Sequence, residues 1–171
     1  MQIRLLYTWL VVTIFVCGCS RENPADPSCR TNSRYLNDPP APAACLIKLD
    51  GKLVALQTNH NEQWLLPHQR LQSHLSAQCT AHQAAWTNTG LNVEVNQLLY
   101  VDEQNTHFYA CVLTDNYALA LRTMEVPPWA KRSVTNIALV DPFATQDNDW
   151  NENLKLIEIR QAFTQIESKI R

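Results

Sequence analysis

Residues 64–95 read WLLPHQRLQSHLSAQCTAHQAAWTNTGLNVEV, which is the pattern of a strand, a loop, a helix and a second strand in succession. Ser76 is a preferred N-cap residue, and Gly90 is the residue type that most often follows the last turn of a helix. The β-rich run LNVEV comes directly after the glycine. The spacing therefore predicts a helix that begins after Ser76, ends before Gly90 and leads into a strand.

The predicted helix has two faces of different character. Successive residues are rotated by about 100° around a helix, so residues three and four apart share a face. The more apolar face is expected to pack against a sheet and comprises Leu75, Cys79, His82 and Trp86. The opposite face is small, uncharged and expected to be exposed, and it comprises Ala84, Thr87 and Asn88.

The same stretch resembles the signature of the Nudix hydrolase family. That signature is a glycine, five residues, a glutamate, seven residues, and then Arg-Glu-apolar-x-Glu-Glu-x-Gly-apolar. Registered on Gly90 and Leu91, and supported by Trp64 and Pro67 upstream, it fits this sequence without a gap. Its first glycine and its charged positions are replaced here, in chain order, by Gln69, Leu75, Gln83, Ala84, Thr87 and Asn88.

The resemblance implies an α/β (α+β) domain, an α-β-α sandwich with a mixed central sheet. It also implies an activity, the cleavage of a nucleoside diphosphate linked to another group, for which the family's helix glutamates hold Mg²⁺ or Mn²⁺. Alanine has no side-chain oxygen, threonine and asparagine have only neutral ones, and no Asp or Glu occurs from Gln63 to Val93. Because hard cations need oxygen ligands, preferably charged, we expect a Nudix-like domain with no catalytic residues, no metal and no other cofactor.

Two alternatives stay open. A divergent hydrolase would recruit carboxylates from outside the signature and would then need Mg²⁺ or Mn²⁺, and the candidates are Glu94, Glu103 and Glu125. A purely structural envelope lipoprotein would instead fill the cleft with side chains. If the cleft persists, aromatic side chains near it would contact a small nucleotide-like ligand, and the candidates are Trp64, Tyr100 and Trp129.

Composition and charge limit the other functions. The chain has 171 residues, of which 46% are hydrophobic, enough for one well-packed domain with additional segments. Its formal net charge is −2 and its basic residues are scattered, so we expect no nucleic-acid partner. Only three glycines occur in the chain, which excludes a glycine-rich phosphate-binding loop.

The N-terminus has the pattern of a bacterial lipoprotein signal peptide. Arg4 precedes an apolar run, Leu5 to Val16, that is too short for an ordinary membrane-spanning helix. The sequence Val-Cys-Gly-Cys follows and resembles a lipobox, which predicts that residues 1–18 are removed and that Cys19 is lipidated. An ordinary signal peptide or a single signal anchor is the alternative.

Lipidation of Cys19 would decide where the protein is found. Each buried methylene of an acyl chain contributes about 0.8 kcal/mol, so several chains anchor a domain to a membrane. Ser20 resembles the sorting residue of outer-membrane lipoproteins. We therefore expect a lipid-anchored protein of the bacterial cell envelope that faces the periplasm, at the outer membrane, with a small ligand or another envelope protein as its partner.

The remaining segments divide into a tether and a domain. Residues 19–43 are rich in Pro, Asn, Ser and charge, so we expect a lipidated, disordered tether, followed by the Nudix-like domain at 44–171. Asp50-Gly51 joins two apolar runs and predicts a β-hairpin. Strands are also expected over 93–101, 106–113 and the run that begins at Ile137. A helix over 151–171 is expected to dock on the sheet through Ile159, Phe163, Ile166 and Ile170.

Four cysteines remain in the mature chain besides Cys19: Cys29, Cys45, Cys79 and Cys111. In an oxidising compartment they allow three pairings, and a role as small core residues is equally open. Among the histidines, His82 lies on the apolar helix face and is expected to be a hydrogen-bonded core residue. The spacing of His60, His68 and His74 matches no recognised metal site, so we assign them to a polar loop.

Overall fold

The computed structural model describes residues 24–32, 38–113 and 124–166. The predicted signal peptide, Cys19 and Ile170 lie outside these residues. A search of the described residues finds no helix that is both long and apolar enough to cross a membrane.

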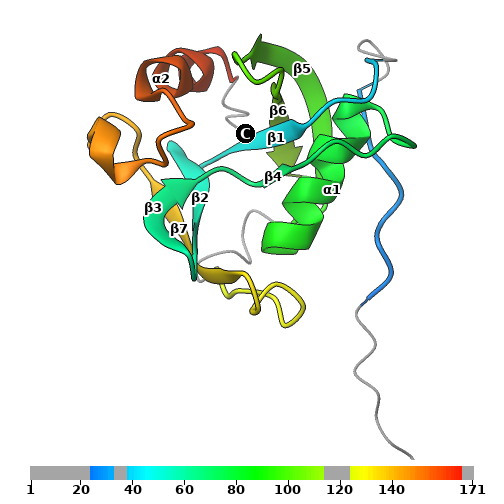
Figure 1. Ribbon diagram of the computed structural model, residues 1–171, viewed down its shortest axis with the longest axis horizontal. Helices are drawn as coiled ribbons and strands as arrows, with labels where there is room; N and C mark the ends of the chain where they lie inside the picture. Colours follow the sequence, from blue (N-terminus) through cyan, green and yellow to red (C-terminus); the bar gives the residue numbers. More distant parts are fainter. Residues whose placement is uncertain (1–23, 33–37, 114–123, 167–171) are drawn as a thin grey trace, which may run out of the picture.

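A mixed β-sheet forms the middle layer of the domain (Figure 1). Its strands in the described residues are β1 (Ala43–Leu49), β2 (Lys52–Thr58), β3 (Asn61–Leu65), β4 (His68–Gln69), β5 (Val93–Val101), β6 (His107–Leu113) and β7 (Val134–Val140). They follow the order β3-β2-β1-β6-β5, with β4 paired to β1 and β7 paired to β2. β1 and β6 are parallel, whereas β1 and β2 form an antiparallel hairpin.

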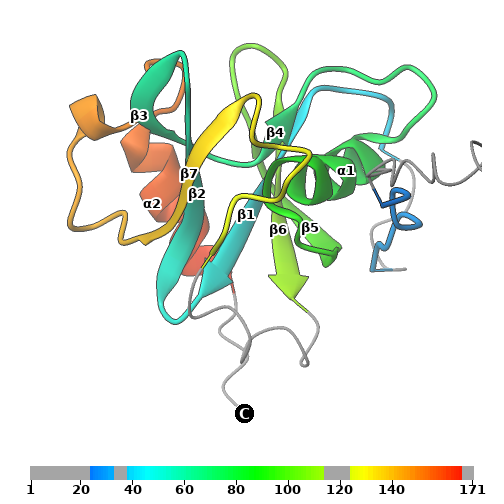
Figure 2. The same cartoon turned by 90° about the horizontal axis from the view of Figure 1, so that it is seen from below.

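Two helices cover opposite faces of this sheet, α1 (Ala77–Thr89) and α2 (Leu156–Gln165), with a short 3-10 helix, η2 (Asp147–Asp149), before α2 (Figure 2). Because side chains alternate along a strand, each strand contributes to two cores. In β1, Cys45 and Ile47 pack in the core under α1, whereas Ala44 and Leu46 pack in the core under α2. The expected α-β-α sandwich with a mixed sheet is confirmed.

The predicted hairpin at Asp50-Gly51 joins β1 to β2. Both residues have positive φ angles, 49° and 71°, which is the conformation that Asp-Gly accepts at low cost in a two-residue turn. Lys48 then pairs with Leu53 across the hairpin. The expected strands also form, as β5, β6 and β7.

Both predicted caps of α1 are present. The Ser76 hydroxyl accepts a hydrogen bond from the backbone N–H of Cys79 at 3.2 Å. Gly90 has a φ of 73°, and its N–H donates to the carbonyl of Trp86 at 2.8 Å. A residue with a side chain would be strained in this left-handed conformation, so the glycine ends the helix.

The buried face of α1 differs from the prediction. Its alanines lie in the core, and Ala77, Ala81, Ala84 and Ala85 are all 0% exposed. Ala84 was expected on the exposed face, whereas Thr87 is exposed as expected. On the expected apolar face only His82 is buried, while Leu75, Cys79 and Trp86 are half-buried. The small alanine side chains allow the helix to approach the sheet closely at these positions.

The described part of the expected tether lies against the domain. We call residues 24–32 the strap. Its Arg30 carbonyl accepts from the Val95 N–H, and its Asn32 N–H donates to the Val95 carbonyl, both at 2.9 Å. Farther along, the Pro39 carbonyl accepts from the N–H of Ala77. These segments therefore differ from the disordered tether that their composition predicts, because β5 and α1 supply partners for their backbone groups.

All four remaining cysteines are paired. Cys45 in β1 is bonded to Cys111 in β6, with 5.7 Å between their Cα atoms. Cys29 in the strap is bonded to Cys79 in the first turn of α1, with 5.4 Å between their Cα atoms. Of the open alternatives, the structure therefore supports disulfides over free core thiols.

The C-terminal helix is shorter than expected. α2 begins at Leu156, because residues 151–155 form turns in which Asn151 accepts from the backbone N–H of Asn153 at 3.1 Å. The predicted apolar stripe is confirmed for Ile159, Phe163 and Ile166, all of which are buried.

Candidate ligand-binding site

A pocket of about 330 Å³ opens on the α2 face of the sheet, beside β4 and the start of β1. Its floor is apolar and includes Ala44, Leu66 and Phe108. Two loops complete it, residues 102–106 between β5 and β6 and residues 151–154 before α2. The polar groups at its rim are His68, Gln69, Arg70, Asp102, Gln104, Thr106, Asn151 and Asn153.

The β5–β6 loop is held in shape by its own hydrogen bonds. The Asp102 carboxylate accepts from the backbone N–H groups of Gln104 at 2.9 Å and Thr106 at 2.7 Å. Asn105 adopts a positive φ of 61° at the tip. Because Asp102 accepts both hydrogen bonds, its carboxylate closes the turn and places a negative charge at the rim of the pocket.

The opposite rim carries positive charge. Arg70 is exposed and has no ion-pair partner among the residues that the structure describes. His68 lies two residues before Arg70. Its Nδ1 atom is 3.1 Å from the carbonyl oxygen of Leu66, so this contact does not involve its Nε2 atom. A pocket with an apolar floor, several side-chain amides and an available guanidinium is suited to a ligand with a ring and an anionic group.

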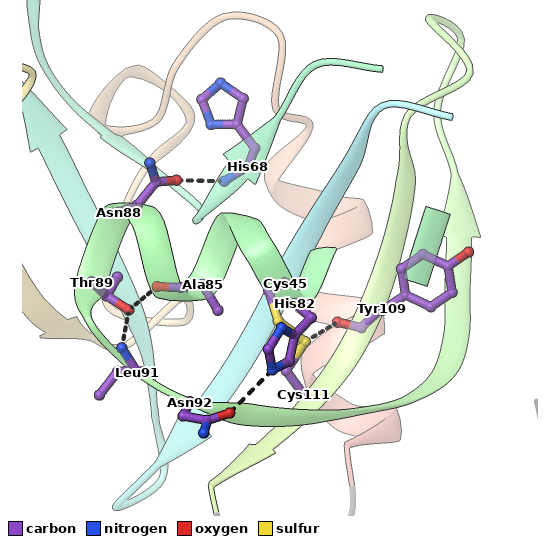
Figure 3. Close-up of a disulfide and its surroundings, with 10 residues drawn as sticks. All are labelled: Cys45, His68, His82, Ala85, Asn88, Thr89, Leu91, Asn92, Tyr109 and Cys111. Atoms are coloured by element: carbon purple, nitrogen blue, oxygen red, sulfur yellow. Dashed lines mark hydrogen bonds between the residues drawn. A yellow bond between two sulfur atoms is a disulfide. The ribbon is translucent and has the colours of Figure 1, made fainter. Parts of the chain in front are cut away.

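Helix α1 fixes the wall of this pocket through two side chains. The Asn88 side-chain oxygen accepts from the backbone N–H of His68 at 3.1 Å, as Figure 3 shows. One turn earlier, the Gln83 oxygen accepts from the Gln69 amide at 3.3 Å. Both contacts reach β4, so polar residues of α1 position a strand that lines the pocket.

Crystal structures of three hydrolases share this architecture. An ADP-ribose pyrophosphatase from Streptococcus suis matches with a TM-score of 0.58 and 14% identity over 77% of this chain and 95% of that chain. A UDP-X diphosphatase matches with a TM-score of 0.57 and 13% identity over 76% and 64%. A Nudix hydrolase from Nitrosomonas europaea matches with a TM-score of 0.56 and 11% identity over 77% and 73%. The domain has the Nudix fold.

Sequence comparison adds nothing to this result, since no family model and no curated protein matches the chain. Identities this low establish the Nudix fold alone. The chemistry must therefore be judged from the side chains that this chain places at the Nudix signature positions.

Those side chains do not fit a divalent cation. Ala84 is buried and has no donor atom, Thr87 is exposed with one neutral hydroxyl, and the Asn88 oxygen is already hydrogen-bonded to β4. Of the other signature positions, Leu75 lies in the loop before α1, and Gln69 and Gln83 bond to each other. Mg²⁺ and Mn²⁺ bind to carboxylates in preference to such neutral groups. Among the described residues, no three His, Cys, Asp or Glu side chains cluster as metal ligands would.

Two of the three candidate carboxylates for a divergent hydrolase, Glu94 and Glu103, lie near opposite ends of β5. Glu94 is the second residue of β5, and Glu103 follows the far end of that strand. The two are therefore on the order of 25 Å apart along the strand. Glu103 is exposed and forms an ion pair with Lys155 at 2.6 Å, which lowers the pKa of its carboxyl group. Glu125 is exposed. Glu94 and Glu103 therefore cannot share one metal ion.

The three aromatic residues predicted to line the cleft do not lie together. Trp64 and Tyr100 pack at the edge of the α2-side core, whereas Trp129 packs on the α1 side and stacks on Trp86 with 5.2 Å between ring centroids. None of the three predicted aromatic residues lines the pocket. The aromatic ring that lines it is Phe108, which stacks on Tyr100 with 4.3 Å between centroids.

The histidines do not form a common site. His82 is 2% exposed and its Nε2 atom is 3.1 Å from the Asn92 side-chain oxygen, which confirms a hydrogen-bonded core residue (Figure 3). Burial lowers the pKa of His82. His60, His68 and His74 line three different hollows, so they do not meet around a metal.

Sequence reasoning missed Arg70, Asn151 and Asn153 as pocket residues. Arg70 directly follows the run WLLPHQ, and the two asparagines precede the C-terminal helix. No spacing rule relates positions so distant in the chain. Their shared signal is only that polar residues follow an apolar strand or precede a helix.

Proposed function

We propose that this protein is a lipid-anchored binding domain with the Nudix fold that lacks the family's metal-dependent catalysis. One observation carries the proposal. The signature positions on α1 hold no carboxylate, and two of the three polar ones, Gln83 and Asn88, hydrogen-bond to the pocket wall. A helix without negative charge gives a divalent ion too few ligands to neutralise a pyrophosphate.

The ligand proposed for the pocket is a small nucleotide-like anion. A volume of about 330 Å³ is at the lower end of the range for small-molecule sites. Phe108 and Leu66 offer contacts to a ring, and Arg70 offers a bidentate partner for a phosphate. The names of two proteins that share the fold, ADP-ribose pyrophosphatase and UDP-X diphosphatase, also refer to nucleotide compounds.

The presence of this pocket supports a binding role over a purely structural one. A purely structural role does not require an apolar pocket beside an exposed arginine. The separation of Glu94 from Glu103 argues against a divergent hydrolase that uses these two carboxylates together. Binding of a small ligand therefore agrees best with the site.

Anchoring through Cys19 places the proposed function at the bacterial envelope, facing the periplasm. The two disulfides support an oxidising compartment, since such bonds persist there and are rare in the cytosol. Metabolic labelling with a radioactive fatty acid tests the anchor. We expect the full chain to incorporate label and a Cys19→Ala variant to incorporate none, and equal labelling of the two would refute lipidation at this residue.

An assay for hydrolysis of nucleotide substrates tests the absence of catalysis. The purified full chain in detergent should release no product from ADP-ribose, ADP or UDP-sugars with Mg²⁺ or Mn²⁺. Product release that a chelator abolishes would refute the proposal.

Binding tests the pocket. Metal-free calorimetry with the same compounds should detect at least one ligand, and Arg70→Ala should weaken it by about tenfold or more, because a charge-assisted hydrogen bond is lost. Arg132→Ala is the matched control, since Arg132 is exposed and does not line the pocket. Absence of binding to the whole panel would contradict a nucleotide-like ligand.

A further inference from the structure

The two disulfides differ in exposure. Cys45 and Cys111 are 0% and 1% exposed and lie in the core beneath α1. Cys29 is exposed, and its partner Cys79 is only half-buried. A dissolved thiol can therefore reach Cys29–Cys79 in the folded protein, but can reach Cys45–Cys111 only after the core opens.

The strap is attached to the domain at two separate places. Near its C-terminal end, Arg30 and Asn32 pair with Val95 of β5 through backbone hydrogen bonds. Before Arg30 it is held on α1 by the Cys29–Cys79 bond and by a hydrogen bond of 3.2 Å from the Gln83 amide to the Asp26 carboxylate.

Residues 26–29 of the strap cover part of α1. A cavity of about 160 Å³ lies under it, lined by Asp26, Pro27, His74, Leu75, His82, Gln83, Trp86 and the disulfide itself. Leu75, in the loop before α1, and Trp86 of α1 are half-buried apolar residues at this cavity. Without the strap, this side of the helix would be open to solvent.

We propose that the Cys29–Cys79 disulfide is a redox-sensitive latch that holds residues 24–29 over α1 and releases them when a dithiol reduces it. The latch itself needs no ligand in the pocket. Gln83 links the latch to the pocket wall, because it bonds both to Asp26 of the strap and to Gln69 of the wall.

One dithiol supplies the two electrons that reduce the disulfide and release the strap. A thiolate of the dithiol attacks Sγ of Cys29, the exposed sulfur, and forms a mixed disulfide while the S–S bond breaks. The electron pair leaves with Sγ of Cys79 as a thiolate. The second thiol of the dithiol then displaces Cys29, so the dithiol is oxidised to a disulfide and the latch gains two electrons.

The location of Cys79 favours this direction of attack. Cys79 is the third residue of α1, after the Ser76 cap, where partial positive charge of the helix end stabilises a thiolate. A better-stabilised thiolate is a better leaving group in exchange. After reduction, Arg30 and Asn32 stay paired with Val95, so only residues 24–29 are expected to move.

Alkylation of the native full chain under graded dithiothreitol tests the latch. We expect mass spectrometry to find Cys29 and Cys79 labelled at a reductant concentration about tenfold or more below that needed for Cys45 and Cys111. Circular dichroism at the lower concentration should be unchanged. Simultaneous labelling of all four cysteines, or labelling only with loss of structure, would overturn the proposal.

A Cys29→Ser variant tests the movement without a reductant, with Ser28→Ala as its matched control. Hydrogen exchange in the variant should rise about tenfold or more over the first turn of α1, whereas the amides of Asn32 and Val95 stay protected. The control should match the wild type. Unchanged exchange at α1, or loss of protection at Val95, would overturn the two-attachment latch.

Discussion

Asn88 accepts a hydrogen bond from the backbone N–H of His68 through its side-chain oxygen, at 3.1 Å. The Nudix signature has a glutamate at this position of the helix. In this chain the position serves to hold β4 beside α1, and β4 forms the wall of the pocket. At a position where the signature has a glutamate, this chain therefore has a structural hydrogen bond.

Replacing Asn88 should therefore affect stability. Asn88→Ala removes the acceptor for the His68 N–H and is expected to lower the free energy of unfolding by about 1 kcal/mol. Asn88→Asp is the matched control, because its carboxylate keeps an acceptor at the same reach. Urea denaturation measures both, and an alanine variant as stable as the aspartate variant would show that the hydrogen bond contributes nothing.

Gly90 tests the predicted end of α1. An added Cβ would lie 3.5 Å from Pro127 and from Trp129, which is ordinary contact, so the cost of Gly90→Ala is conformational. We expect a loss of about 1 kcal/mol from the positive φ. Gly90→Asn should cost less, since asparagine tolerates this conformation better. Thermal unfolding of the pair checks the order, and equal midpoints would contradict it.

His82 gives the stability a pH dependence. Burial lowers its pKa, the hydrogen bond with Asn92 partly offsets this, and the charge of Arg30 adds to it. The unfolded chain therefore takes up a proton near pH 6.5 while the folded protein does not. The free energy of unfolding should fall as pH drops from that value through the lowered pKa, by at most about 1.4 kcal/mol per pH unit.

A His82→Gln variant isolates this contribution. Every other titrating group is shared, so the difference between wild type and variant should grow in favour of the variant as the pH falls below 6.5. Urea denaturation at several pH values between neutral and acidic provides the curves. Parallel curves would mean that His82 does not titrate differently in the two states.

The buried disulfide should be a major source of stability. Cys45 and Cys111 are separated by 66 residues, and closing a loop of that size stabilises the fold by about 4 kcal/mol in the chain-entropy model. The double variant Cys45→Ala, Cys111→Ala is expected to lose roughly that amount in urea denaturation. A loss below about 1 kcal/mol would indicate that the paired strands alone restrain these residues.

The parts of the fold that could be predicted are those with local signals. Ser76 and Gly90 mark the ends of α1, Asp50-Gly51 marks a hairpin, and the spacing of Ile159 and Phe163 marks the inner face of α2. Each signal depends on neighbours within a few residues. That is why these elements form where the sequence indicates.

The parts that could not be predicted depend on tertiary contacts. The inner face of α1 mixes alanines with Gln78, Thr80 and His82, so no apolar stripe in the sequence marks it, and the prediction that Ala84 is exposed is wrong. Four cysteines do not specify their pairing. The pocket joins Arg70 to Asn153, and nothing in the sequence relates two residues so far apart.

Manganese binding tests the central claim most directly. The paramagnetic resonance signal of free Mn²⁺ should persist in full when the purified chain is added, because α1 offers no carboxylate at its signature positions. A Thr87→Glu, Asn88→Glu variant, which returns two carboxylates to that helix, serves as the comparison. Stoichiometric loss of the signal in the wild-type protein, reversed by Mg²⁺, would contradict the account of a Nudix fold without its metal site.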